Sequence, residues 1–96
     1  MKQDAILVKL APHSIRTVER SAVLKIDGTD KVLVLNPVAA TIVNDLRENV
    51  GSQLSIDALV ATIQQRFDIG EIPLSTVRRD VQETLNAFVE NGLLVP

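Results

Sequence analysis

The stretch VLVLNPVAATIVNDL, residues 32–46, changes from a strand-like to a helix-like sequence at Asn36-Pro37. Residues 32–35 alternate valine and leucine, an aliphatic and partly β-branched run that favours a strand. Asn36 is a preferred helix N-cap, and Pro37 suits the first helical position because its missing N–H would have no partner there. The apolar side chains that follow recur at helical spacing and predict one apolar face: Val38, Ile42 and Leu46. We therefore expect a strand joined directly to a helix, which should end by residues 49–51.

The strand predicted over residues 32–35 does not alternate between apolar and polar side chains, as a half-buried antiparallel strand should. Its two leucines share one face and its two valines share the other, so both faces are apolar. One interpretation is a strand covered on both sides, for example by an N-terminal arm. The other is a sheet edge beside an apolar groove, because unpaired N–H and C=O groups are a template for a guest strand. The residues alone leave these two interpretations nearly even.

Residues 14–35 as a whole are predicted to form a two- or three-stranded antiparallel sheet, because β-branched and aliphatic residues recur through this range. Between the last two of these runs lies Asp27-Gly28-Thr29-Asp30, a hairpin-turn signal in which Gly28 can adopt a positive φ. The sheet is preceded by residues 1–13, which we expect to be an N-terminal arm. Pro12 near its end fixes φ and lacks an N–H.

The rest of the chain is predicted to be helical. A second helix should follow Ser55 as N-cap, with Asp57 in the first turn complementing the helix dipole. Its apolar residues have helical spacing: Ile56, Leu59, Val60, Ile63 and Phe67. A break over residues 68–73 precedes a third helix, from about Ser75 to Asn91, whose apolar face is Val77, Val81, Leu85, Phe88 and Val89. Gly92 is predicted at C′, which would fold Leu93 back onto Phe88 in a Schellman motif.

The composition of the 96 residues indicates one domain with an aliphatic core, since 46% of them are hydrophobic. There are no cysteines, which excludes disulfides, zinc-thiolate sites and a cysteine nucleophile. No apolar run approaches the ~18 residues of a membrane-spanning helix, and the N-terminus lacks a signal-peptide pattern. The net charge of −2 and the absence of Tyr and Trp argue against binding to nucleic acids. We expect a soluble cytoplasmic protein.

The sequence offers no catalytic constellation. His13 is the only histidine, and its place beside Pro12 predicts a solvated loop residue rather than a catalytic base. The glycines are scattered and form no phosphate-binding loop. Carboxylates are plentiful on the predicted helices, where solvated faces and cap charges account for them. We therefore predict no enzymatic activity, no metal site and no cofactor.

A winged helix-turn-helix DNA-binding regulator is the alternative, because three helices with a hairpin are typical of that fold. Arg78-Arg79 lies at the start of the third predicted helix, where a DNA reader would carry basic residues. Near the hairpin, however, only two lysines are available and two aspartates oppose them: Lys25, Lys31, Asp27 and Asp30. Two arginines on an exposed helix face are an equally good interpretation.

The order of these motifs resembles that of the coenzyme PQQ synthesis protein D family over residues 10–95. The matching features are Leu10-Ala11-Pro12, the hairpin, the Ala39-Ala40-Thr41-Ile42 centre of the first helix, LVATIQQRFDI and DVQETLNAFVENGLLV. Each motif is loose, but their order and spacing together are fairly specific. The chain departs from the family after the first helix, where residues 48–53 replace a tight Asp-Gly turn.

This resemblance implies a RiPP recognition element, a non-catalytic module that captures the leader of a ribosomally made precursor peptide. Such a module presents the leader to a modifying enzyme of the same pathway, such as a radical SAM protein, a peptidase or a cyclase. The implied fold is α+β and winged helix-turn-helix-like, with a three-stranded antiparallel sheet packed on three helices. The peptide-binding domain would span residues 14–96. Neither nucleic acid nor membrane is an expected partner, and we expect a monomer or a weak dimer, including one that exchanges strands.

In this family the leader adds as a strand to the third β-strand, against the third helix. Mapped onto this chain, the guest would lie along residues 31–35, with the flank of the third helix as the other wall. Arg78 or Arg79 would pair with an acidic residue of the leader. The resulting candidate peptide-binding residues are Lys31, Val32, Leu33, Val34, Leu35, Arg78, Val81, Gln82 and Leu85.

Overall fold

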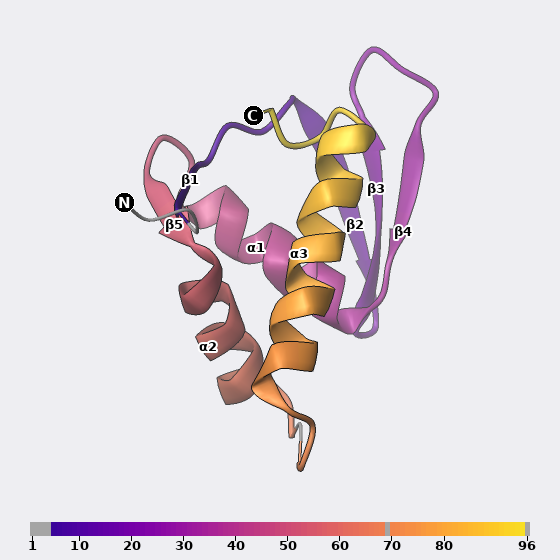
Figure 1. The fold of residues 1–96 in the computed structure, drawn as a ribbon. Helices are drawn as coiled ribbons and strands as arrows, with labels where there is room; N and C mark the ends of the chain where they lie inside the picture. The colour runs from indigo at the N-terminus through magenta and orange to yellow at the C-terminus, as the bar shows by residue number, and fades with distance from the viewer. Residues whose placement is uncertain (1–4, 69, 96) are drawn as a thin grey trace.

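The computed structural model describes residues 5–68 and 70–95, which form five strands and three helices. In chain order these are β1 (Ala5–Leu7), β2 (His13–Val18), β3 (Ser21–Ile26), β4 (Val32–Leu35), α1 (Pro37–Glu48), β5 (Gln53–Ser55), α2 (Ile56–Arg66) and α3 (Leu74–Glu90). Figure 1 shows the hairpin strands β2, β3 and β4 on one side of the molecule and the helices on the other. The predicted α+β fold with a three-stranded antiparallel sheet is confirmed.

The main sheet has the order β2-β3-β4, so β4 is an edge strand that pairs with β3. The hairpin before β4 turns at Gly28, whose φ of 78° confirms the predicted turn. The turn between β2 and β3 was not predicted, because it uses Glu19 in place of a glycine or asparagine. Glu19 adopts a φ of 58°, in the left-handed region that a non-glycine residue rarely occupies.

The helix starts follow the predicted caps. The Asn36 side-chain oxygen accepts a hydrogen bond from the N–H of Ala39 at 2.8 Å, with Pro37 in the first turn. The Ser55 hydroxyl accepts one from the N–H of Ala58 at 3.0 Å. Both caps are confirmed, and the first of them fixes the sharp change of direction from β4 into α1.

The core lies between the main sheet and the three helices, and all the buried side chains of the described residues are apolar. Ala22, Leu24 and Ile26 of β3 and Leu35 of β4 face it from the sheet. The predicted apolar face of α3 supplies Val77, Val81, Leu85 and Phe88, whereas Val89 is 37% exposed and lies at its margin. α1 packs against β3 and β4, and α2 packs against both other helices.

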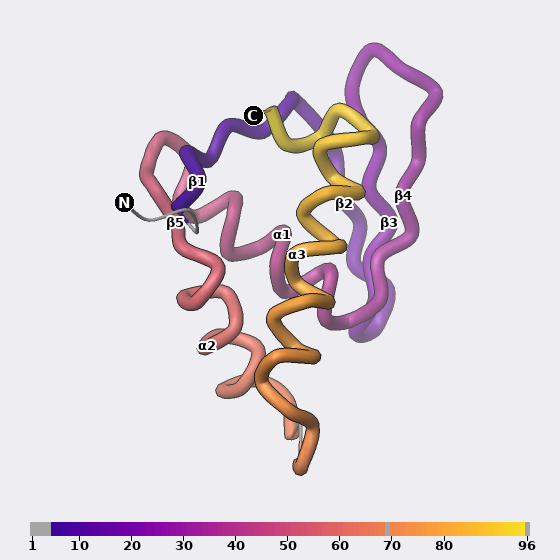
Figure 2. Tube along the Cα trace, in the orientation of Figure 1, coloured from indigo at the N-terminus to yellow at the C-terminus, as the bar shows by residue number. Residues whose placement is uncertain are grey.

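The N-terminal segment is part of the fold. β1 pairs antiparallel with β5 in a second, two-stranded sheet, which the sequence did not predict. The next residue, Val8, is fully buried, and its N–H donates to the carbonyl of Ser52 at 2.9 Å. Further on, Leu10 forms a bridge with Leu94, so the segment after β1 and the C-terminal residues lie side by side (Figure 2). This segment does not cover β4.

The C-terminus of α3 has the predicted Schellman motif. The N–H of Gly92 donates to the carbonyl of Val89 at 3.1 Å, and the N–H of Leu93 donates to that of Phe88 at 2.9 Å. Gly92 has a φ of 82°, and Leu93 is fully buried. This motif returns the chain to the N-terminal segment, where the N–H of Ala11 donates to the carbonyl of Leu93 at 2.8 Å.

We expect Gly92→Ala to lower the free energy of unfolding by about 1–2 kcal/mol, because a left-handed backbone is unfavourable for a residue with a Cβ. Beyond Gly92 and its two chain neighbours, nothing lies within 4 Å of the position that this Cβ would occupy, so the cost is conformational rather than a clash with the rest of the fold. Urea denaturation measures it, with Glu90→Ala on the exposed face of the same helix turn as the control. Equal stabilities of the two variants would contradict this role of Gly92.

Candidate functional site

A groove of about 560 Å³ lies between β4, the start of α1 and one face of α3. Its lining residues are Val32, Leu33, Val34, Leu35, Asn36, Val38, Ala39, Asp80, Glu83, Thr84, Ala87, Phe88 and Asn91. β4 and α3 run in opposite directions along the two sides (Figure 1). All four residues of the edge strand contribute, so the groove runs along the free edge of the sheet.

The register of the sheet fixes which main-chain groups of β4 face this edge. The N–H of Ile26 donates to the carbonyl of Lys31 at 3.2 Å, which makes these two residues a hydrogen-bonded pair. Such pairs alternate along an antiparallel ladder, so Leu33 and Leu35 also direct their N–H and C=O groups toward β3. Val32 and Val34 therefore direct theirs away from β3. The free edge presents two donors and two acceptors beside the groove.

The side chains of β4 divide between the two faces of the sheet. Leu35 is only 3% exposed and belongs to the core, and Leu33 is half-buried. On the outer face, the exposed fractions are 53% for Val32 and 79% for Val34. Both faces of β4 are apolar although only one of them is covered. Of the two interpretations of the sequence, the structure therefore has the strand at the sheet edge and not the strand covered on both sides.

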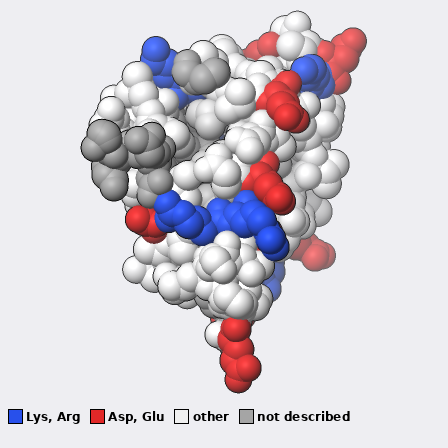
Figure 3. Space-filling model, in the orientation of Figure 1, with Lys and Arg blue, Asp and Glu red and all other residues white. Residues whose placement is uncertain are grey.

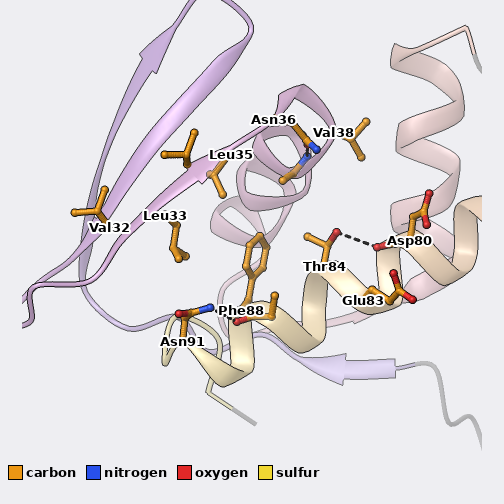
Figure 4. A pocket seen from close by; sticks show the side chains of 13 residues that line it. Val32, Leu33, Leu35, Asn36, Val38, Asp80, Glu83, Thr84, Phe88 and Asn91 are labelled. Atoms are coloured by element: carbon orange, nitrogen blue, oxygen red, sulfur yellow. Dashed lines mark hydrogen bonds between the residues drawn. The ribbon is translucent and has the colours of Figure 1, made fainter.

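One end of the groove is apolar. Leu33, Leu35 and Phe88 point toward one another there, with Asn91 closing the end nearest the hairpin (Figure 4). Phe88 lines the groove but is only 3% exposed, so its ring belongs to the core and forms the floor of the groove. Ala87 and Thr84 are small side chains on the same wall, and they leave room above this floor.

The other end of the groove is acidic. Asp80 and Glu83 project from α3 near Asn36 and Val38, at the end where β4 leads into α1 (Figure 4). Both are exposed, and neither carboxylate has an ion-pair partner among the described residues. Because Thr84 donates its hydroxyl to the carbonyl of Asp80 at 2.9 Å, its side chain is satisfied by its own helix.

The structure places the candidate residues of α3 outside this groove lining. Val81 and Leu85 are buried in the core, with exposed fractions of 1% and 3%. Gln82 lies with Leu85 on a smaller apolar depression beside β1. Arg78 is ion-paired with Asp57 of α2. Of the residues proposed from β4 and its approach, Val32 to Leu35 all line the groove, whereas Lys31 is exposed next to it.

Sequence reasoning predicted that the third helix forms the other wall of the groove, but it selected residues of that helix that do not line it. The residues of α3 that do line it have helical spacing: Asp80, Glu83, Thr84, Ala87, Phe88 and Asn91. Most are polar or small, and such a stripe is ordinarily a solvated face. The sequence feature that could have indicated the groove is the position of this stripe next to Phe88, because small residues beside a large buried aromatic side chain leave a depression.

Catalytic and metal-binding features are not evident in the described part of the chain. It contains no group of three or more His, Asp or Glu side chains that could hold a metal ion. His13 begins β2 rather than lying in a loop, and its Nδ1 donates to the carbonyl of Ala11 at 2.8 Å. None of the helices in the described part of the chain combines the length and the apolar character that a membrane span requires.

The model of the family described as coenzyme PQQ synthesis protein D (PqqD) matches residues 8–94. This chain belongs to the PqqD family. The match spans the main sheet, the groove and all of α3, so the resemblance inferred from sequence motifs is confirmed. No curated protein matches the chain.

The fold of this PqqD-family chain is similar to that of a solved structure described as lasso peptide synthetase B1 complexed with the leader peptide. The two share 22% sequence identity with a TM-score of 0.74, and the match covers 95% of this chain and 100% of the other. At this identity the similarity establishes a shared fold. It includes nearly the whole chain and therefore both walls of the groove.

Proposed function

We propose that this protein is a RiPP recognition element, which binds the leader of a ribosomally synthesised precursor peptide by strand addition to β4. The observation that carries the proposal is the exposed edge of β4 beside a groove of about 560 Å³. Two findings support it: membership of the PqqD family, and a fold shared with the structure described as lasso peptide synthetase B1 complexed with the leader peptide.

Strand addition explains how one surface would combine affinity with selectivity. The main-chain groups of Val32 and Val34 would bond any extended peptide, which makes their contribution largely independent of sequence. Alternate side chains of the guest would enter the groove above Phe88, where their size and polarity matter. The leader would thus be recognised by backbone geometry first and by a few side chains second.

In this proposal the protein has no catalytic activity of its own and presents the bound leader to a modifying enzyme of the same pathway. A radical SAM protein, a peptidase or a cyclase would act on the rest of the precursor. The groove supports a binding role because its charged lining residues, Asp80 and Glu83, lie on an exposed surface rather than in an enclosed site.

DNA binding, the alternative from the sequence, gains no support from the geometry. Arg78 is engaged with Asp57, so one of the two arginines that motivated it lies in an ion pair between helices. The neighbouring Asp80 and Glu83 make the groove side of α3 acidic. Phosphates would be repelled there rather than bound.

The test is a titration of the isotope-labelled chain with a synthetic leader from a candidate precursor peptide, one that a short gene near its own would encode. We expect the amide signals of β4 and of the groove side of α3, around Thr84 and Ala87, to shift with saturation. A scrambled leader of the same composition is the control. Absence of shifts in β4 and α3 with the native leader would contradict strand addition.

A further inference from the structure

The lining of the groove carries charge of one sign. Asp80 and Glu83 line it, and no Lys or Arg is among the described residues that do. Figure 3 shows the α3 side of the molecule, where a band of basic side chains directly borders acidic ones. Arg78, which the sequence assigned to the groove, is held by Asp57 outside its lining. The groove therefore has the opposite charge from the one that the sequence predicted.

The two carboxylates are placed to meet the guest rather than the protein. Asp80 and Glu83 lie three residues apart on one face of α3, so they repel each other as like charges. Neither has a cationic partner among residues 5–68 and 70–95. A guest cation would relieve this repulsion and complement the groove, because charge complementarity selects partners at interfaces.

The arrangement also fixes where along the guest the cation would lie. The apolar end of the groove, at Leu33 and Phe88, is next to the start of β4 and the end of α3 (Figure 4). The acidic end lies beyond Leu35, where Asn36 begins α1. A strand rises about 3.3 Å per residue, so an apolar side chain and a cation of one guest would reach the two ends only if they were a few residues apart.

We propose that the leader recognised by this protein carries a lysine or arginine a few residues from an apolar anchor, and that Asp80 and Glu83 select it. The anchor would occupy the groove above Phe88, and the cation would lie against the two carboxylates beside Asn36. This inference rests on the proposed leader binding and adds to it the chemical class of the leader. It gives α3 the role of choosing among peptides that β4 alone would accept.

The experiment measures the affinity of the native leader and of a leader with its Lys and Arg residues replaced by Gln, using a fluorescent label. With wild-type protein, we expect the replacement to weaken binding about three- to tenfold, as for a partly exposed charge pair. The Asp80→Asn/Glu83→Gln variant should bind the native leader about as weakly as wild-type protein binds the replaced leader. This variant should also bind the two leaders with similar affinity, because the interaction between the leader cation and the two carboxylates is already absent.

The matched control is Glu48→Gln/Glu71→Gln, which changes the net charge equally at exposed positions outside the groove lining. It should retain the preference for the cationic leader. Equal affinities of the two leaders for wild-type protein, or equal losses in the control and groove variants, would overturn the charge selection while leaving strand addition intact. Failure of every leader to bind would instead refute the proposed function itself.

Discussion

Val34→Pro is expected to weaken leader binding about tenfold to a hundredfold while the domain remains folded. The N–H of Val34 points away from β3, so proline removes a donor that only a guest strand would use. Leaving the corresponding acceptor of the guest unpaired costs about 1–3 kcal/mol. Proline is tolerated on an edge strand when its nitrogen faces solvent, so the sheet itself keeps its hydrogen bonds. A labelled leader titrated into each variant gives the affinities.

The matched control for this substitution is Thr17→Pro on β2, the opposite edge of the same sheet. Thr17 pairs with Ala22, and the alternation of the ladder again directs its N–H away from β3. This variant therefore carries the same backbone change on an exposed edge strand outside the groove. We expect it to bind the leader like wild-type protein. If the Val34→Pro variant bound the leader as tightly as wild-type protein does, the guest would not form main-chain hydrogen bonds with β4.

Phe88→Ala is expected to lower the free energy of unfolding by about 3–5 kcal/mol, the largest stability effect among these substitutions. Phe88 is 3% exposed and forms both part of the core and the floor of the groove. Removing its ring leaves a cavity below the groove, while the backbone carbonyl that accepts the Leu93 N–H is retained. Since domains of this size are stable by roughly 5–15 kcal/mol, the variant should remain marginally folded.

Urea denaturation with linear extrapolation measures this loss, and Val89→Ala is the control. Val89 is the next residue of the same helix but is 37% exposed, so its truncation should cost far less. Similar midpoints for the two variants would contradict the assignment of Phe88 to the core.

The features that the sequence predicted are those that local physics decides. Asn36 and Ser55 form the caps, and Gly92 ends α3, because each acts through hydrogen bonds to residues close in the chain. The apolar periodicity likewise identified the core face of α3, since burial follows hydrophobicity at helical spacing. An aliphatic, β-branched composition located the strand Val32–Leu35, which lines the groove, whereas the position of this strand at the sheet edge was implied only by the family resemblance.

The groove face of α3 could not be found in this way. Val81 and Leu85 attracted attention as apolar residues, but the core already uses them. The residues that do line the groove, such as Thr84 and Asp80, have the polarity of a solvated helix face. Which polar face borders a sheet edge depends on how the helix packs against the sheet, and this is a tertiary property that periodicity does not contain.

The small sheet of β1 and β5 was missed for a related reason. Each strand has three residues, and residues 5–7 pair with residues 53–55, far along the chain. Such short segments carry little propensity of their own, and their pairing depends on the burial of Val8 against the rest of the fold. An arm was therefore expected where the structure has an integrated strand.

Strand addition at β4 is tested most directly by amide hydrogen exchange of residues 32–35 with and without the leader. The amides of Leu33 and Leu35 bond to β3 and should exchange slowly in both states. Those of Val32 and Val34 point to the free edge and should exchange rapidly until the leader binds, and slowly afterwards. A leader that saturates the protein while the exchange of Val32 and Val34 stays rapid would contradict binding as an added strand.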